Sequence, residues 1–208
     1  MKSPAHWMLF FALAPPLMST TTPATTTQVT VDQGSKIRFP SPNGEWEVDS
    51  VTPKTEEGNS SLVLKSGSGR RSLPLGEFFR SGTLIWSSNS QVLLFLDRHS
   101  AEDTRLRVFL IPGSDGVQTD SADREIRSSI LKLIGGGNRI LFYDLEVPSC
   151  SGDEFVVSAR VVTVSKDVTS GPAKRWDGKY IVHLKPLRVT RESFRVTAEG
   201  VEKQFQAH

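Results

Sequence analysis

The sequence predicts an all-β protein built from antiparallel sheets, and three observations support this prediction. Short segments rich in Val, Ile, Leu and aromatic residues recur along the chain, separated by clusters of Gly, Pro, Ser and Asn. Two stretches that lie 46 residues apart share the same order of turn, strand, charged loop and strand. One segment, residues 123–134, instead has helical periodicity. Short apolar segments between polar turns are typical of antiparallel sheets.

The expected strands are the segments with the composition of half-buried or buried β-structure. They are residues 61–65, 83–86, 91–96, 105–111, 139–143, 154–164 and 179–184.

The repeat is anchored by two turns. The first is Pro40-Ser-Pro-Asn-Gly44, and the second is Trp86-Ser-Ser-Asn-Ser90. In this alignment Trp86 corresponds to Pro40, so we expect it at the turn, whereas Trp46 lies on the strand that leaves the first turn. A weaker third copy begins at residues 137–142, with residues 154–162 as its second strand. One such unit cannot bury its apolar face alone, so we expect the copies to stack.

The helical segment places Ile126, Ile130, Leu133 and Ile134 on one face. Gly135-Gly-Gly137 follows directly and supplies a stop. We therefore expect one short helix near residues 123–134, packed on a sheet. A further strand is the alternative, because Ile and Ser are only moderate helix formers.

The two turns resemble those of the WD40-like β-propeller repeats of exported bacterial proteins, whose blades carry a Trp-Ser-Pro-Asp-Gly turn before an inner strand. The resemblance covers residues 37–115 and extends to the third copy. It implies about three propeller-like blades. A closed propeller needs at least four blades of four strands, which this length holds only if every blade is minimal. Three arrangements stay open: an open partial propeller, a propeller completed by another chain, and a two-layer β-sandwich.

The amino terminus has the pattern of a secretory signal peptide. Lys2 precedes an apolar run, and small residues follow up to a candidate cleavage site at Thr22-Pro-Ala24. The run is about 11 residues long and Pro15-Pro16 interrupts it, whereas a membrane span needs about 20. We expect a signal peptide over residues 1–24, a Thr-rich tether over 25–36 and a single β-rich domain over 37–208. The protein would then be periplasmic or secreted, with no transmembrane segment after cleavage.

Charge and cysteine content narrow the function classes. The formal net charge is +2, and removing residues 1–24 takes away only Lys2, so a general attraction for nucleic acid is not expected. Cys150 is the only cysteine, so no internal disulfide can form. We expect Cys150 in a loop after Pro148 as an inert small residue, with a reactive thiol as the alternative.

No set of residues has the spacing of a known catalytic or metal centre. The histidines form no ligand pair, and we assign no catalytic residue, cofactor or metal. The acidic residues Asp144, Glu146 and Asp153 are the one cluster that could bind a cation through oxygen ligands or hydrolyse a polymer.

The carboxyl-terminal stretch is locally basic, and Lys185, Arg188, Arg191 and Arg195 are its candidate contacts for an anionic partner. The alternative, which we favour, is the solvated face of a strand pair. The main hypothesis is therefore an exported, non-enzymatic binding or scaffolding protein with a protein partner, including self-association that completes a β assembly. An extracytoplasmic polymer hydrolase that uses Asp144, Glu146 and Asp153 is the alternative.

Overall fold

The computed structural model describes residues 26–52, 59–111, 117–166, 173–198 and 201–206. Residues 117–119, 198 and 201–206 are described by their backbone alone. The expected signal peptide, residues 1–24, lies outside the described residues. The described chain forms three antiparallel sheets and one helix, which confirms the predicted all-β class with a single short helix.

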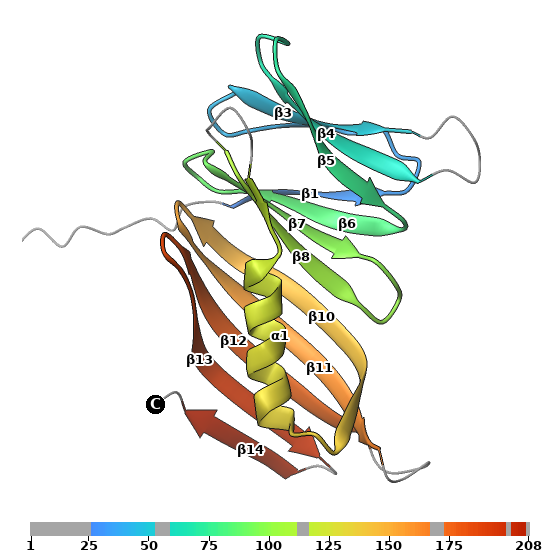
Figure 1. Ribbon diagram of the computed structural model, residues 1–208, viewed down its shortest axis with the longest axis vertical. Helices are drawn as coiled ribbons and strands as arrows, with labels where there is room; N and C mark the ends of the chain where they lie inside the picture. The colour runs from blue at the N-terminus through green and yellow to red at the C-terminus, as the bar shows by residue number, and fades with distance from the viewer. Residues whose placement is uncertain (1–25, 53–58, 112–116, 167–172, 199–200, 207–208) are drawn as a thin grey trace, which may run out of the picture.

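The three sheets follow one another along the long axis of the molecule (Figure 1). We call them the N-terminal, central and C-terminal sheets. The N-terminal sheet has the order β2 (Arg38–Pro40), β3 (Trp46–Val51), β4 (Ser60–Ser66), β5 (Ser72–Phe78). The central sheet has the order β1 (Thr27–Asp32), β6 (Ser81–Trp86), β7 (Val92–Arg98), β8 (Thr104–Leu110), β9 (Val117–Thr119). The C-terminal sheet has the order β10 (Asn138–Ser151), β11 (Glu154–Ser165), β12 (Lys174–Leu184), β13 (Leu187–Ala198), β14 (Val201–Gln206).

Strand β1 corrects the prediction of a tether over residues 25–36. Thr27–Asp32 pairs along its whole length with β6 of the central sheet. The segment alternates Thr or Gln with Val, a composition that suits a pleated, half-buried surface. Val31 is fully buried and Val29 packs beside it, so the apolar half of the alternation is what places this strand in the fold.

The 46-residue repeat is present in the structure. Strands β2, β3, β4 and β5 of the N-terminal sheet correspond in order to β6, β7, β8 and β9 of the central sheet. Trp86 ends β6 at the second turn and Trp46 begins β3 after the first, as the alignment predicts. The two blade-like sheets are therefore related units.

The two turns repeat the same hydrogen bonds. The Ser41 hydroxyl donates to Asn43 Oδ1 over 2.8 Å and accepts from the backbone N–H of Trp46 over 3.0 Å. In the second turn, the Ser87 hydroxyl donates to Asn89 Oδ1 over 2.8 Å and accepts from the N–H of Val92 over 2.9 Å. A Ser and an Asn two residues later can thus satisfy the turn backbone locally, which explains why both residue types recur at this spacing.

The third copy departs from the first two. The element before β10 is helix α1 (Ser121–Ile134), where the earlier copies have a strand and a turn. Strands β10 and β11 are also much longer, at 14 and 12 residues, than β3 and β4. The C-terminal sheet is therefore a long antiparallel meander covered on one face by α1 (Figure 1).

Helix α1 forms where the apolar spacing predicts it, although it begins two residues earlier. Ile126, Ile130 and Ile134 are buried against the sheets, and Leu133 is partly buried beside them. The helix ends at Ile134 because Gly135 adopts a φ of 76° and a ψ of 162°, an extended conformation with positive φ that favours glycine.

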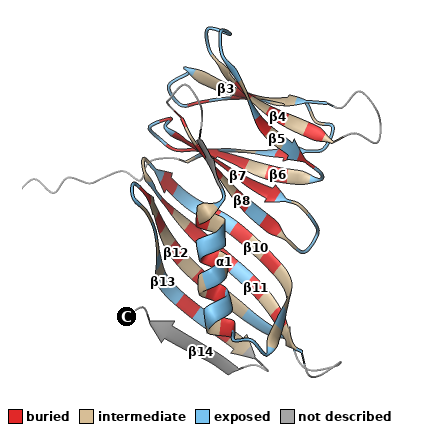
Figure 2. Cartoon of the chain, viewed as in Figure 1, coloured by how far each residue is buried: buried red, intermediate tan, exposed pale blue. Residues whose placement is uncertain are grey.

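The central sheet has no solvent face over most of β7 (Figure 2). Leu93 and Phe95 belong to a core shared with the N-terminal sheet. Leu94 and Leu96 belong to a second core shared with α1 and the C-terminal sheet. Because side chains alternate across a strand, a continuous apolar run is required when both faces are covered.

Arg107 joins the central sheet to the N-terminal sheet by a hydrogen bond, and an ion pair within the central sheet holds it in place. Arg107 on β8 binds the fully buried carboxylate of Asp97 on β7 and donates to the carbonyl of Glu77 on β5 over 3.1 Å. Its guanidinium also lies 5.7 Å from the ring centroid of Phe95. Removing either charge would leave the other without its partner in a buried interface.

The second turn yields a prediction about backbone strain. Ser90 has a φ of 61°, whereas Gly44 occupies the equivalent place with a φ of 72°. Ser90→Gly and Ser90→Ala both remove the hydroxyl that accepts from the N–H of Asn43, but only glycine avoids the left-handed cost of about 1 kcal/mol. We expect Ser90→Gly to unfold in urea with a free energy about 1 kcal/mol above that of Ser90→Ala. Gly44→Ala is the matched control, and its free energy of unfolding should fall by a similar amount. Equal stability of Ser90→Gly and Ser90→Ala would contradict the conclusion that Ser90 is strained.

Asp97 yields a prediction about pH. Burial raises the pKa of Asp97 above its ordinary value, and the charge of Arg107 opposes this only in part. The native state therefore holds this proton more tightly than the unfolded chain. The stability that Asp97 contributes is fully present below about pH 4 and is lost as pH rises through the native pKa. We expect the difference in free energy of unfolding, wild type minus Asp97→Asn, to fall as pH rises from 4 towards 7 in urea titrations. A difference that is constant with pH would refute this.

Candidate binding groove

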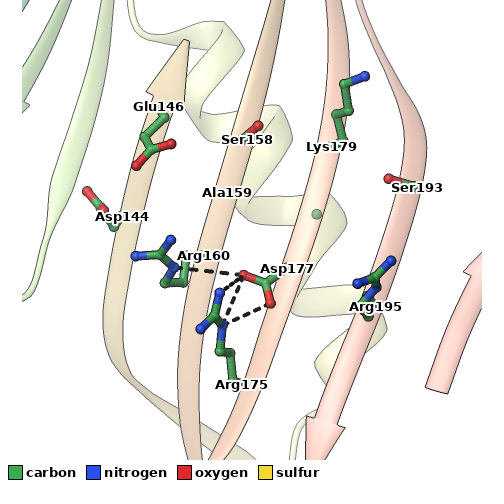
Figure 3. Close-up of a pocket in the computed structure, with 11 residues that line it drawn as sticks. Asp144, Glu146, Ser158, Ala159, Arg160, Arg175, Asp177, Lys179, Ser193 and Arg195 are labelled. Carbon is green, nitrogen blue, oxygen red and sulfur yellow. Dashed lines mark hydrogen bonds and ion pairs between the residues drawn. The ribbon is translucent and has the colours of Figure 1, made fainter. Parts of the chain in front are cut away.

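The described surface carries a charged groove on the outer face of the C-terminal sheet, opposite α1. Figure 3 looks onto this face, and the helix lies behind the strands. The groove has a volume of about 320 Å³ and is lined by strands β10, β11, β12 and β13. Its charged members are Asp144, Glu146, Arg160, Arg175, Asp177, Lys179 and Arg195.

The strand register places four of these charges in one row across the sheet. Asp144 is directly opposite Arg160, Arg160 is opposite Asp177, and Asp177 is opposite Arg195. Acidic and basic residues thus alternate from strand to strand (Figure 3). Directly opposite residues lie within about 5.5 Å, so each charge has neighbours of the opposite sign, and the row is favourable across the sheet.

Asp177 is the centre of the row. It accepts two hydrogen bonds from Arg175 Nε, at 2.9 and 3.1 Å, and one from the Arg175 Nη2 atom at 3.0 Å. Arg160 Nε lies 3.8 Å from the same carboxylate. These side chains are partly exposed, so each pair contributes little to stability on its own. The hydrogen bonds from Arg175 do fix the direction of its guanidinium group, whereas the longer contact of Arg160 is electrostatic only.

The acidic side of the groove is the strand β10. Asp144 Oδ1 accepts from the hydroxyl of Thr104 over 3.0 Å, which ties it to the central sheet. Glu146 lines this groove and also a second opening of about 660 Å³ between β10 and the central sheet. Glu146 therefore stands on the ridge between the two openings.

The structure separates the three acidic residues that the sequence grouped. Asp144 and Glu146 share the groove, but Asp153 lies in the turn between β10 and β11 and binds Lys185 over 3.1 Å. Within the described part of the chain, no three His, Cys, Asp or Glu side chains gather as a metal-binding group. The oxygen-ligand site imagined for these three carboxylates is therefore not assembled.

The four basic residues of the carboxyl-terminal stretch also take different places. Arg188 and Arg195 point to the outer face, and Lys185 lies in the turn between β12 and β13. Arg191 lies opposite the buried Tyr180 and its Nε is buried, so it belongs to the helix-facing side. A register shift between Lys179 and Tyr180 reverses the alternation along β13. Binding of an anionic partner by these residues stays a prediction.

Cys150 lies in strand β10, which corrects the predicted loop. It is 1% exposed, and burial raises the pKa of its thiol to about 12. A thiol of this kind is protonated at neutral pH and is a poor nucleophile.

No site role is predicted from the sequence for Arg160, nor for Arg175, Asp177 and Lys179. The available signal was the alternation of β11, in which Ser158 and Arg160 fall on one face and Val157 and Ala159 on the other. Alternation identifies the face, but only the register shows which charges become neighbours.

The described residues contain no helix that is long and apolar enough to cross a membrane. Comparisons with family models, with curated proteins and with solved structures find no match to this chain. The groove must therefore be interpreted from its own residues.

The split of the basic residues predicts unequal effects of charge reversal. Arg188→Glu and Arg195→Glu change exposed charges and should each alter the free energy of unfolding by less than about 1 kcal/mol. Arg191→Glu places a carboxylate beside the buried Tyr180 and should cost roughly 2 kcal/mol or more. Urea unfolding of the three single variants measures this. Equal effects at all three positions would mean that Arg191 does not face the helix side.

Proposed function

We propose that this protein is an exported, non-enzymatic binding or scaffolding module of the periplasm or the secreted fraction, built on WD40-like β-repeats. The amino-terminal pattern of residues 1–24 supports export. The repeated turns and the stacked, blade-like antiparallel sheets support the repeat family. The observation that carries a binding role is the alternating row Asp144, Arg160, Asp177 and Arg195 on an exposed sheet face.

The chemistry of the groove favours a protein partner. Four basic and three acidic side chains line it, so neither a polyanion nor a polycation finds a surface of a single opposite sign. Phosphates of a nucleic acid would meet Asp144, Glu146 and Asp177. A protein surface on which acidic and basic side chains alternate can match both signs, and such matching gives specificity and faster association.

The hydrolase alternative rests on one observation, the shared position of Asp144 and Glu146 in the groove. Two residues apart on a strand, their backbones lie about 7 Å apart on the same face. Inverting glycoside hydrolases hold their two carboxyl groups at a similar separation. The pairing of Asp153 with Lys185 removes the third proposed carboxylate from this site.

The test is a quantitative comparison of partner recovery from a native envelope extract. The groove variant replaces Arg160, Arg175 and Arg195 with Ala. The matched control removes the same number of positive charges outside the groove, by replacing the exposed residues Arg70, Arg124 and Lys132 with Ala. We expect wild type and control to recover the same protein in a salt-dependent manner, and the groove variant to recover at least about tenfold less with an unchanged circular dichroism spectrum. Equal recovery by all three proteins would contradict the proposal. Cleavage of an envelope polymer that is lost in Asp144→Asn would favour the hydrolase.

A further inference from the structure

We infer that two copies of this chain associate through the free edge of strand β1, which joins two central sheets into one continuous antiparallel sheet. The inference goes beyond the proposed groove, because β1 lies on a different sheet and uses backbone groups for binding. It commits to a second copy of this chain as the occupant of the edge.

The backbone of β1 defines the free edge. Among the strands that the structure describes, β1 is the end of the central sheet and pairs with β6 alone. Just beyond β1, the N–H of Gln33 donates to the carbonyl of Arg80 over 2.6 Å, so the odd-numbered residues turn their backbone groups towards β6. In an antiparallel pair the next residue directs its N–H and C=O the other way. Gln28 and Thr30 therefore present their N–H and C=O groups to the open side.

The end of this edge is closed locally. The N–H of Asp32 donates to the Ser35 hydroxyl over 3.1 Å, and the carbonyl of Asp32 accepts from the N–H of Ser35 over 3.0 Å. Gln28 and Thr30 have no such local partner among the described residues. The open window is thus confined to the segment before Asp32.

The other edges with described side chains carry the features that prevent strand addition. Strand β2 has three residues and ends at Pro40. Strand β5 contains Pro74, next to a register shift. Strand β10 contains Pro148 and a register shift, and its Tyr143 N–H already donates to the carbonyl of Glu102 over 2.8 Å. Residues 27–31 of β1 have no proline, no charge and no register shift.

The edge is complementary to itself. If Val29 lies on a two-fold axis, Gln28 faces Thr30 of the second copy, and both outward residues of each strand exchange backbone hydrogen bonds with their counterparts. Val29 then faces its own copy in the close, non-hydrogen-bonded position, and Thr27 faces Val31. No two like charges meet, because Asp32 lies beyond the paired window.

The strand is exposed along this edge, because the side chains of Thr27, Gln28 and Thr30 are all exposed. The side chains of Gln28 and Thr30 line the opening of about 660 Å³ beside the central sheet, together with Thr83 and Arg98. Val29 points to the opposite side, where it packs against the core shared with the N-terminal sheet. A single pair of short strands forms a small interface, so we expect a reversible dimer whose population depends on concentration.

The first test uses two variants with the same number of new charges. Gln28→Lys with Thr30→Lys places two like-charged pairs across the axis, whereas Gln28→Lys with Thr30→Glu places two oppositely charged pairs there. Sedimentation over about a hundredfold range of concentration should show a wild-type dimer, one weakened at least about tenfold in Lys/Lys and one retained in Lys/Glu. Circular dichroism checks that both variants fold. A wild type that stays monomeric, or a dimer that both variants affect equally, would overturn the inference.

The second test fixes the register. Val29→Cys places two thiols at the non-hydrogen-bonded position on the axis, where Cα atoms lie about 4.5 Å apart and a disulfide can form. Thr27→Cys is the control, because its copy lies several residues away along the partner strand. Oxidation should cross-link Val29→Cys and leave Thr27→Cys monomeric on a non-reducing gel, since the native Cys150 is buried. Cross-linking of Thr27→Cys but not of Val29→Cys would reject this register.

Discussion

The fold depends on strand β7, whose side chains are buried on both faces. Leu93 and Phe95 pack towards the N-terminal sheet, and Leu94 and Leu96 pack towards α1 and the C-terminal sheet. Each core includes one face of the central sheet, so both outer layers bury part of their apolar side against it. Even Gly82 on β6 follows from this constraint, because a Cβ there would lie 2.2 Å from the ring of Phe95. The central sheet therefore connects the two outer layers.

Polar side chains determine the orientation of the outer layers relative to the central sheet. Towards the N-terminal sheet, Arg107 links Asp97 to the backbone of β5. Towards the C-terminal sheet, Arg127 of α1 binds Asp123 over 2.7 Å and Asp103 over 2.8 Å, and its guanidinium lies 3.9 Å from the ring centroid of Tyr143. Apolar contacts tolerate small shifts between layers, whereas a directed ion pair does not. Each interface thus combines non-directional burial with one arginine that sets its orientation.

Much of the fold could be predicted from the sequence where a single pattern was uninterrupted. The apolar run of β7, the isoleucines of α1 and the Ser-Asn turns are local signals. Strand β5 was missed because Pro74 and a glycine break its pattern, and an edge position tolerates them. Strand β13 could be recognised only as a basic stretch, because its apolar residues do not keep one alternation along the strand. The alternation reverses where the register with β12 shifts after Lys179. The groove could not be predicted, because Arg160 and Asp177 become neighbours only when β11 and β12 pair as a hairpin.

The position of β1 has a consequence for the order in which the molecule folds. β1 precedes the whole N-terminal sheet in the chain, yet it pairs with β6, which follows that sheet in the chain. Thr27 pairs with Trp86, and Asp32 pairs with Ser81. Pairing β1 with β6 closes a loop that contains β2 to β5. The entropy lost in closing this loop must be overcome before the β1–β6 hydrogen bonds can stabilise the fold. The meander of β6, β7 and β8 requires only short closures and can form first. The N-terminal sheet is thus inserted in the sequence between two strands of the central sheet. Pairing of β1 with β6 is then a late step in folding, and it fixes both ends of the inserted sheet to the central sheet.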